Sequence, residues 1–189
     1  EEALELKDLG VEVHQLDITN PVSVDFLKSQ LDGRLLDILV NNAGIGGHST
    51  SELKDLDIER LKNTFDVNAL GALRVIQALI PNMKMGSRRV VASMSSRMGS
   101  IAQNTGGAIG YRASKSALNS INKSLSNEFS EQDFVFVVLH PGWVRTDMTN
   151  ERATYSTDES AKELFQVITS LSKGDNGQFY DLHGKSIAW

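Results

Sequence analysis

Short apolar runs that lead directly into polar or glycine-containing segments are the feature of this sequence that most limits its fold. Residues 35–40 lead into 41–44, and residues 134–139 lead into 140–142. Neither run alternates between apolar and polar residues, which is typical of strands buried on both faces. Amphipathic helical patterns separate such runs, and this alternation predicts a parallel sheet covered by helices. We therefore expect a doubly wound α/β fold in a single domain over residues 1–189.

Turn signals and helix caps predict the remaining elements. Further strands are expected at residues 11–16, 88–92 and 177–182, and helices at 1–9, 20–31, 57–80, 111–129 and 157–171. Asp55 or Asp57 is expected to cap the helix that Pro81 stops, and Thr157 or Asp158 to cap the last helix. Because the carboxyl ends of parallel strands share one edge of a sheet, the polar residues that follow the strands predict a ligand site there.

Composition narrows the kind of ligand. The 189 residues have a net charge of −5 and no cysteine, and the four histidines are dispersed. These properties argue against binding of nucleic acid or anionic membranes, exclude thiol chemistry and give a metal site little support. The longest apolar runs are too short to cross a bilayer, and no signal peptide precedes the first element. We expect a cytoplasmic protein with a small-molecule ligand.

Tyr111 and Lys115 lie on one face of the predicted helix 111–129, because residues four apart are neighbours on a helix. Apolar residues continue that face, so the lysine is expected on the buried side. The structural alternative is a core tyrosine beside a lysine that reaches out to solvent. Asn68 lies in the apolar stripe of a helix, where an amide must be hydrogen-bonded to be tolerated. It is either a core residue bonded to neighbouring backbone or a residue that faces the same site as Tyr111 and Lys115.

Five motifs occur in a fixed order along the chain. They are Asn41-Asn42-Ala43-Gly44, Asn68, Ser95-Ser96-x-x-Gly99, Tyr111-x-x-x-Lys115 and Pro141-Gly142-x-x-x-Thr146. Together they resemble the short-chain dehydrogenase/reductase family from about residue 11 to the end. The sequences of 95–101 and 184–189 further resemble the branch that contains C-factor and the sniffer-type carbonyl reductases. The resemblance implies a Rossmann-like three-layer fold and NAD(P)-dependent hydride transfer between a nicotinamide cofactor and a carbonyl or alcohol substrate.

The resemblance assigns four catalytic residues. Tyr111 would pass a proton to or from the substrate oxygen, and Ser96 would hydrogen-bond the substrate carbonyl. Lys115 would hold the nicotinamide ribose, and Asn68 would support a proton relay through water to that lysine. We expect the Lys115 ammonium to lower the pKa of Tyr111, because a nearby positive charge favours the phenolate. Ser95 is expected to cap or pack.

The cofactor implied by the resemblance is NADP or NAD, with NADP favoured. Asp17 matches the acidic residue beside the adenine ring, and Pro141, Gly142 and Thr146 match the segment that holds the nicotinamide amide. The full set expected to bind the cofactor is Asp17, Ile18, Asn41, Asn42, Ala43, Gly44, Tyr111, Lys115, Pro141, Gly142, Val144 and Thr146. Residues 45–51, 97–110 and 143–156 would line the substrate pocket, with 146–155 as its lid.

The first strand, Gly-rich turn, first helix and second strand of the family have no counterpart in these 189 residues. Without them the sheet would be split between 11–16 and 35–40, and the latter strand would have an unpaired edge. Since backbone amides of such a turn bind the pyrophosphate, we expect a fragment of a longer chain that binds its cofactor weakly and whose own activity is doubtful.

Two other functions compete with the enzyme. A dinucleotide-sensing regulatory or signalling protein without significant turnover is the main alternative, although such relatives usually lose part of the catalytic set. A nucleotide-sugar epimerase or dehydratase would need a C-terminal substrate domain, and only 74 residues follow Lys115. The resemblance also allows a homodimer through helices 57–80 and 111–129, whose outward faces are expected to include Lys62, Arg74, Asn119 and Lys123.

Overall fold

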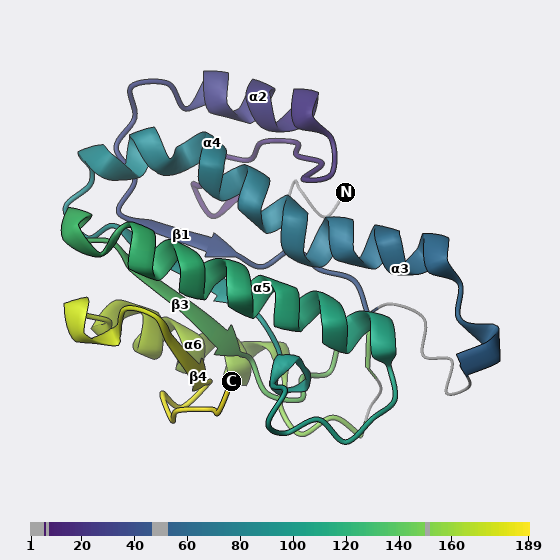
Figure 1. Ribbon diagram of the computed structural model, residues 1–189. Helices are drawn as coiled ribbons and strands as arrows, with labels where there is room; N and C mark the ends of the chain where they lie inside the picture. The colour runs from purple at the N-terminus through teal and green to yellow at the C-terminus, as the bar shows by residue number, and fades with distance from the viewer. Residues whose placement is uncertain (1–5, 7, 47–52, 150–151) are drawn as a thin grey trace.

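The structure is a computed structural model that describes residues 6, 8–46, 53–149 and 152–189 (Figure 1). Its sheet contains four parallel strands in the order β1 (Ile38–Asn41), β2 (Val90–Met94), β3 (Val135–His140) and β4 (Gln178–Asp181). Asn41 pairs with Ser93 and His140 pairs with Asp181, so the carboxyl ends of the strands lie along one edge.

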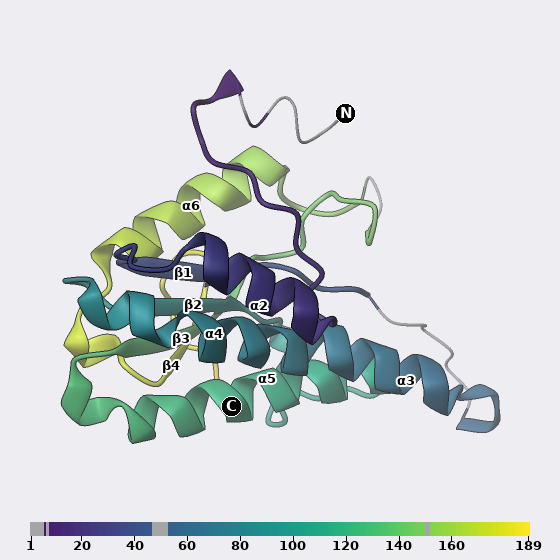
Figure 2. The same cartoon turned by 90° about the horizontal axis from the view of Figure 1, so that it is seen from above.

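Helices cover both faces of this sheet. They are α2 (Pro21–Gln30), α3 (Ile58–Phe65), α4 (Ala72–Met85), α5 (Ile109–Glu128) and α6 (Thr157–Ser170). Figure 2 shows α4 and α5 on one side of the sheet and α6 on the other. The prediction of a doubly wound parallel sheet in three layers is therefore confirmed.

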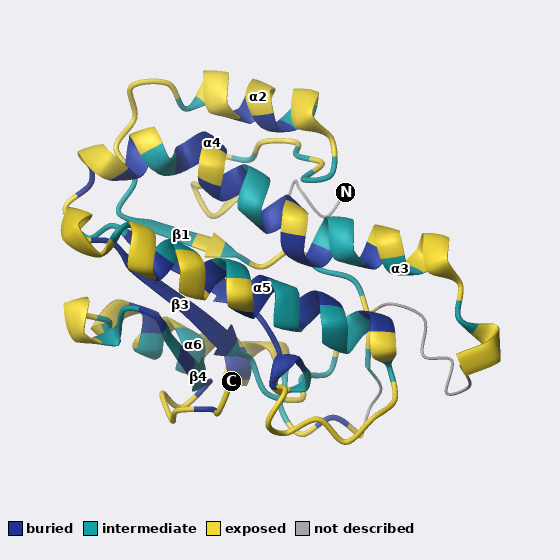
Figure 3. Ribbon diagram, viewed as in Figure 1, coloured by how far each residue is buried: buried dark blue, intermediate teal, exposed yellow. Residues whose placement is uncertain are grey.

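The central strands form the core, as their unbroken apolar runs predict. Every residue of β2 and the first five residues of β3 are buried (Figure 3). Met94 and Leu139 belong to the apolar cluster that α6 joins through Ile168. Val91 and Phe136 pack on the opposite side, against α4. This two-sided packing makes β2 and β3 rigid supports for the loops at their carboxyl ends.

The outer strand β1 departs from the prediction that it is buried on both faces. Val40 is 44% exposed, and the other residues of β1 are partly exposed. In the described part of the chain, no strand pairs with the outer edge of β1. The predicted strand at 11–16 is also wrong, since these residues form no ladder there. A strand needs a neighbour for its backbone hydrogen bonds, and apolar sequence alone does not supply one.

The helix predicted for 57–80 differs in two ways. A π-helical segment, η2 (Asp66–Gly71), interrupts it, and Pro81 lies inside α4 instead of stopping it. The turn that contains Pro81 is fixed by tertiary contacts: the Asn82 amide donates to the carbonyls of Leu31 and Arg34 at 2.5 and 2.8 Å, and Met83 is fully buried. These contacts offset the hydrogen bond that proline cannot make.

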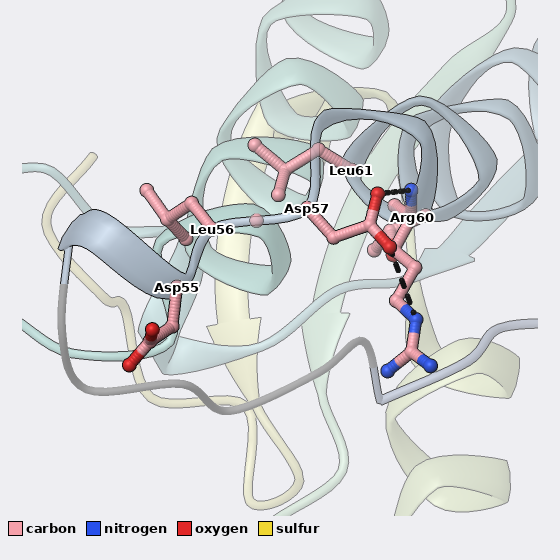
Figure 4. Close-up of a pocket in the computed structure, with 7 residues that line it drawn as sticks. Asp55, Leu56, Asp57, Arg60 and Leu61 are labelled. Atoms are coloured by element: carbon pink, nitrogen blue, oxygen red, sulfur yellow. Dashed lines mark hydrogen bonds and ion pairs between the residues drawn. The ribbon is translucent and has the colours of Figure 1, made fainter.

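Side-chain caps set where α3 and α6 begin. Asp57, and not Asp55, caps α3, because its carboxylate accepts from the backbone of Glu59 and Arg60 at 3.0 and 3.2 Å (Figure 4). α6 is capped by Ser156 and not by the predicted Thr157 or Asp158. Its hydroxyl accepts from the backbone N–H of Glu159, whose carboxylate accepts from that of Ser156 in return. This reciprocal capping box stabilises the first turn of α6.

The beginning of α5 is placed by contact with α3. A side-chain carbon at Gly110 would lie 3.1 Å from Cγ of Leu61, so the two helices approach closely just before Tyr111. The small depression between them is lined by residues 55–57, 60, 61, 64 and 110 (Figure 4). Among the described residues, no helix has the length and apolarity that a bilayer crossing requires.

Candidate active site

The buried face of α5 brings Tyr111 and Lys115 together at the carboxyl edge of the sheet. Lys115 is only 4% exposed, and its Nζ donates to the carbonyl of Met94, the last residue of β2, at 2.8 Å. The Nζ atom lies 5.8 Å from the centre of the Tyr111 ring. The lysine therefore does not extend to solvent, and its ammonium is held between α5 and a strand end.

Burial has opposite consequences for the charges of these two groups. It lowers the pKa of Lys115 from 10.5 to about 8, because the ammonium loses water as a solvating partner. It also raises the pKa of Tyr111, and a hydrogen bond with the Ser96 side chain opposes that rise only partly. The expectation that Lys115 would lower the pKa of Tyr111 is thus wrong for the protein alone, since loss of solvation is the larger effect.

Ser96 reaches Tyr111 from the end of β2. Its hydroxyl accepts from the backbone N–H of Met98 at 3.2 Å, so it caps the short helix η3 (Arg97–Gly99). It also lies near enough to the phenol to oppose the rise in the pKa of Tyr111. Ser96 is 6% exposed. The structure therefore places the predicted substrate-binding hydroxyl beside the predicted proton donor.

Asn68 lies in the π-helical segment η2 and is 1% exposed. Its amide accepts from the backbone N–H of Ile45 at 2.8 Å and donates to the carbonyl of the same residue at 2.9 Å. A further bond at 3.0 Å runs to the hydroxyl of Ser114 on α5. Asn68 thus joins α5 to the loop after β1. π-helical turns often occur at functional sites, and the proton relay through Asn68 remains a prediction.

Gly44 lies against both polar groups of this interior. A side-chain carbon there would lie 3.2 Å from Oδ1 of Asn68 and 3.4 Å from Nζ of Lys115. In the same loop, Asn42 and Ala43 are exposed at the end of β1, and the Asn41 amide donates weakly to Ser93 at 3.4 Å. Glycine at position 44 lets the backbone approach both the amide and the lysine closely.

The loop after β3 is shaped by contacts with α6 and with its own later residues. The Pro141 carbonyl accepts from the hydroxyl of Ser160 at 2.7 Å. Gly142 has a φ of +86°, and a side chain there would meet the Tyr155 ring at 2.8 Å. Val144 pairs with Tyr155 in an isolated bridge, and the Thr146 N–H donates to Thr149 at 3.0 Å. Residues 150 and 151 of the predicted lid, and 47–51 of the predicted pocket, lie outside the described residues.

Asp17 and Ile18 lie in the segment that packs against the end of η2. The Asp17 carboxylate accepts from the backbone and hydroxyl of Thr19 at 2.9 and 2.7 Å, and these hydrogen bonds hold its pKa below the usual value. Ile18 packs against the end of η2, where a side chain at Gly71 would lie 2.6 Å from its Cδ1. This contact explains why position 71 is glycine. Asp17 remains exposed and available at the surface.

Two buried polar side chains near the site escaped the sequence-based interpretation. Asn119, expected on an outward face, is 4% exposed and bonds Ser95 and Gly99. Its position one turn after Lys115 was the signal that could have revealed it. His140 ends β3 with a buried Nδ1 that has no hydrogen-bond partner in the described structure. Ser95 packs as expected.

The side chains present fit the nicotinamide half of a dinucleotide better than its phosphate half. Tyr111, Lys115 and the open backbone at Gly44 lie together, and Asp17 offers a carboxylate for the adenosine end. Within the described ranges, no Gly-rich turn leads from a strand into a helix to supply amides for the pyrophosphate. The same residues contain no group of three side chains that could hold a metal ion.

Comparison with known proteins agrees with this geometry. The family model described as short chain dehydrogenase matches residues 2–156. The chain is 44% identical over 155 residues to C-signal of Myxococcus xanthus, covering 82% of this chain and 93% of that protein. It superimposes on the carbonyl reductase Sniffer of D. melanogaster with a TM-score of 0.94 at 33% identity, covering 99% of this chain and 84% of that one.

A second solved structure is similar over the whole chain. It is the NADPH-bound carbonyl reductase from chicken fatty liver, with a TM-score of 0.89 and 30% identity, covering 100% of this chain and 81% of that one. The family model alone covers well over half of the 189 residues. On this evidence, and with the ordered motifs assembled at one edge of a parallel sheet, the chain belongs to the short-chain dehydrogenase family.

Proposed function

We propose that this protein is an NAD(P)-dependent oxidoreductase that reduces a carbonyl compound or oxidises the corresponding alcohol. Solved relatives support the cofactor class, because one carbonyl reductase similar to this chain has bound NADPH and a short-chain dehydrogenase from Burkholderia multivorans has bound NADP. These relatives favour NADP over NAD. A bound nicotinamide cofactor would supply or accept the hydride, and side chains of the protein would donate or accept the proton.

Tyr111 is the proposed general acid–base. Its raised pKa keeps the phenol protonated at neutral pH, which suits donation of a proton to a substrate oxygen during reduction. Ser96 would bind that same oxygen, since its hydroxyl lies beside the phenol. Lys115, buried one turn along α5, would hold the nicotinamide ribose.

The placement of Ser96 beside Tyr111 is the observation that carries this proposal. It joins a strand end to a helix at the edge where open α/β sheets bind ligands. Lys115 stands 5.8 Å from the ring of the same tyrosine. A tyrosine with only a packing role would not need a neighbouring hydroxyl and a buried ammonium at the carboxyl edge of the sheet.

The test is NADPH consumption with a panel of aldehydes, ketones and quinones. Tyr111→Phe removes the proton donor at little packing cost, and turnover should fall by about 100-fold or more. Tyr180→Phe is the matched control, because that phenol bonds Asp175 away from the site. If Tyr111→Phe and the parent turn over equally, the acid–base assignment is wrong.

Cofactor affinity has its own measurement. These 189 residues contain no Gly-rich turn that could bind the cofactor's pyrophosphate. We therefore propose that the chain binds NADPH with a dissociation constant above the micromolar range. The turnover assay therefore uses millimolar cofactor. A chimera in which the N-terminal segment of Sniffer is fused in front of this chain serves as the high-affinity form. Micromolar binding by the unmodified chain would contradict this proposal.

A second candidate is a dinucleotide-sensing signalling protein without significant turnover. The 44% identity to C-signal of Myxococcus xanthus favours it. The two functions separate in one comparison, in which NADPH binding and turnover are measured on the same preparation. Binding without turnover by the parent and the chimera, with no effect of Tyr111→Phe, would support the sensor.

A further inference from the structure

One buried amide joins the two elements that present Ser96 and Tyr111. Asn119 lies on α5, one turn beyond Lys115, and its Oδ1 accepts from the Ser95 hydroxyl at 2.5 Å. Its Nδ2 donates to the carbonyl of Gly99 at 3.2 Å. Ser95 and Gly99 flank the turn that begins with Ser96, so Asn119 holds both ends of that turn against α5.

The turn is also pressed directly onto the backbone of α5. A side-chain carbon at Gly99 would lie 2.9 Å from the carbonyl carbon and from Cβ of Lys115. The Gly99 carbonyl receives a second hydrogen bond, from the hydroxyl of Ser116 at 2.8 Å. The separation of Ser96 from Tyr111 therefore depends on how closely η3 packs on α5.

Another buried amide of α5 shows what is particular to Asn119. Asn122 is 1% exposed and accepts from the Ser93 hydroxyl at 3.2 Å. Its Nδ2 donates to Leu118 within its own helix at 2.9 Å. Both asparagines bond a serine of the β2 segment, but among the described contacts only Asn119 bonds η3. Asn122 is thus a natural control of equal size and similar burial.

We propose that Asn119 is a positioning residue that fixes the Ser96 turn on α5 and so keeps the Ser96 hydroxyl within hydrogen-bonding reach of Tyr111. The inference rests on the proposed function, in which Ser96 and Tyr111 act on one substrate oxygen. No contact of Asn119 with substrate is required, since it acts through Ser95 and Gly99.

The positioning role has a consequence that simple support of the fold does not have. The hydrogen bond from Ser96 is the contact that opposes the effect of burial on the pKa of Tyr111. When Asn119 is lost and the turn moves, this bond weakens and the pKa of Tyr111 rises. Alcohol oxidation needs the phenolate, so its rate should then require a higher pH.

The experiment measures the pH dependence of kcat for alcohol oxidation in the parent and in the variants Asn119→Ala, Ser96→Ala and Asn122→Ala. The midpoint of the alkaline rise should move up by about one pH unit in Asn119→Ala and in Ser96→Ala. Below the midpoint this shift lowers kcat about tenfold. The double variant of Ser96 and Asn119 should shift no further than Ser96→Ala alone, and Asn122→Ala should keep the parental midpoint.

A second readout does not depend on turnover. The chain has three tyrosines, so the ¹³Cζ signal of Tyr111 can be assigned with Tyr111→Phe and followed at neutral pH. Asn119→Ala should move that signal in the same direction as Ser96→Ala, while Asn122→Ala should leave it in place. Ser95→Ala removes one of the two bonds at almost constant volume, and it replaces Asn119→Ala if that variant does not fold.

The outcomes separate the inference from the function on which it rests. Parental midpoint and parental ¹³Cζ signal in folded Asn119→Ala would overturn the positioning role. Additive effects of the Ser96 and Asn119 changes would overturn it too, because the residues would then act independently. Unchanged turnover in both Ser96→Ala and Tyr111→Phe would reject the proposed function, while the ¹³Cζ measurement would still decide the role of Asn119.

Discussion

Replacing Lys115 with methionine should stabilise the fold at neutral pH while removing the proposed ribose contact. The side chain is 4% exposed, and burial lowers its pKa from 10.5 to about 8. Since the unfolded chain binds this proton more tightly than the folded one, stability rises with pH between about 8 and 10.5. Below pH 8 the buried charge destabilises the fold.

The magnitude follows from that difference in pKa. About 2.5 pH units at about 1.36 kcal/mol per unit corresponds to about 3 kcal/mol. Methionine removes the charge but leaves the Met94 carbonyl without its donor, which costs about 1–3 kcal/mol. The net gain at neutral pH is therefore about 1 kcal/mol, and the pH dependence is the sharper quantity.

The assay is urea unfolding of the parent, Lys115→Met and Lys62→Met between about pH 7 and pH 10. Lys62 is exposed on α3 and serves as the control for loss of a lysine. Across this range the free energy of unfolding of the parent should rise by about 2–3 kcal/mol relative to Lys115→Met. Lys62→Met should follow the parent. Parallel curves for the parent and Lys115→Met would refute the reasoning.

Two further predictions concern the carboxyl end of β3 and the loop that follows it. Burial, and to a lesser degree the charge of Arg97, lowers the pKa of His140 from 6.5 to about 4, so the folded state gains its proton later than the unfolded state as pH falls. His140→Gln should abolish about 3 kcal/mol of the stability loss between pH 6.5 and 4, and equal acid sensitivity in urea unfolding would contradict this. Gly142→Ala should lower the free energy of unfolding by about 1–3 kcal/mol, because φ is +86° and the new carbon would meet Tyr155. A melting temperature equal to that of the parent would contradict it.

Several parts of the site could be predicted because they depend on local pattern. The central strands are unbroken apolar runs, and the polar residues that follow them must lie at one edge once the strands are parallel. Helical spacing places Tyr111 and Lys115 on one face, and the burial cost of an amide marks Asn68 as a bonded residue. These inferences need no knowledge of which segments meet.

Other parts depended on partners that are distant in sequence. Residues 11–16 have strand-like sequence but no neighbour to pair with in the described structure. Pro81 lies inside α4 because Asn82 bonds two carbonyls about 50 residues away. Asn119 reads as an exposed polar residue until η3 is packed over it.

The sequence alone therefore determined the class of fold, the edge that holds the site and the identity of its polar groups. Hydrophobic periodicity and helical spacing act along the chain, so they are readable from it. Only the tertiary structure decided that the pKa of Tyr111 is raised and that Ser96 lies beside that phenol. Both depend on how much water burial removes and on angstrom-scale contacts between β2, η3 and α5, which no local pattern encodes.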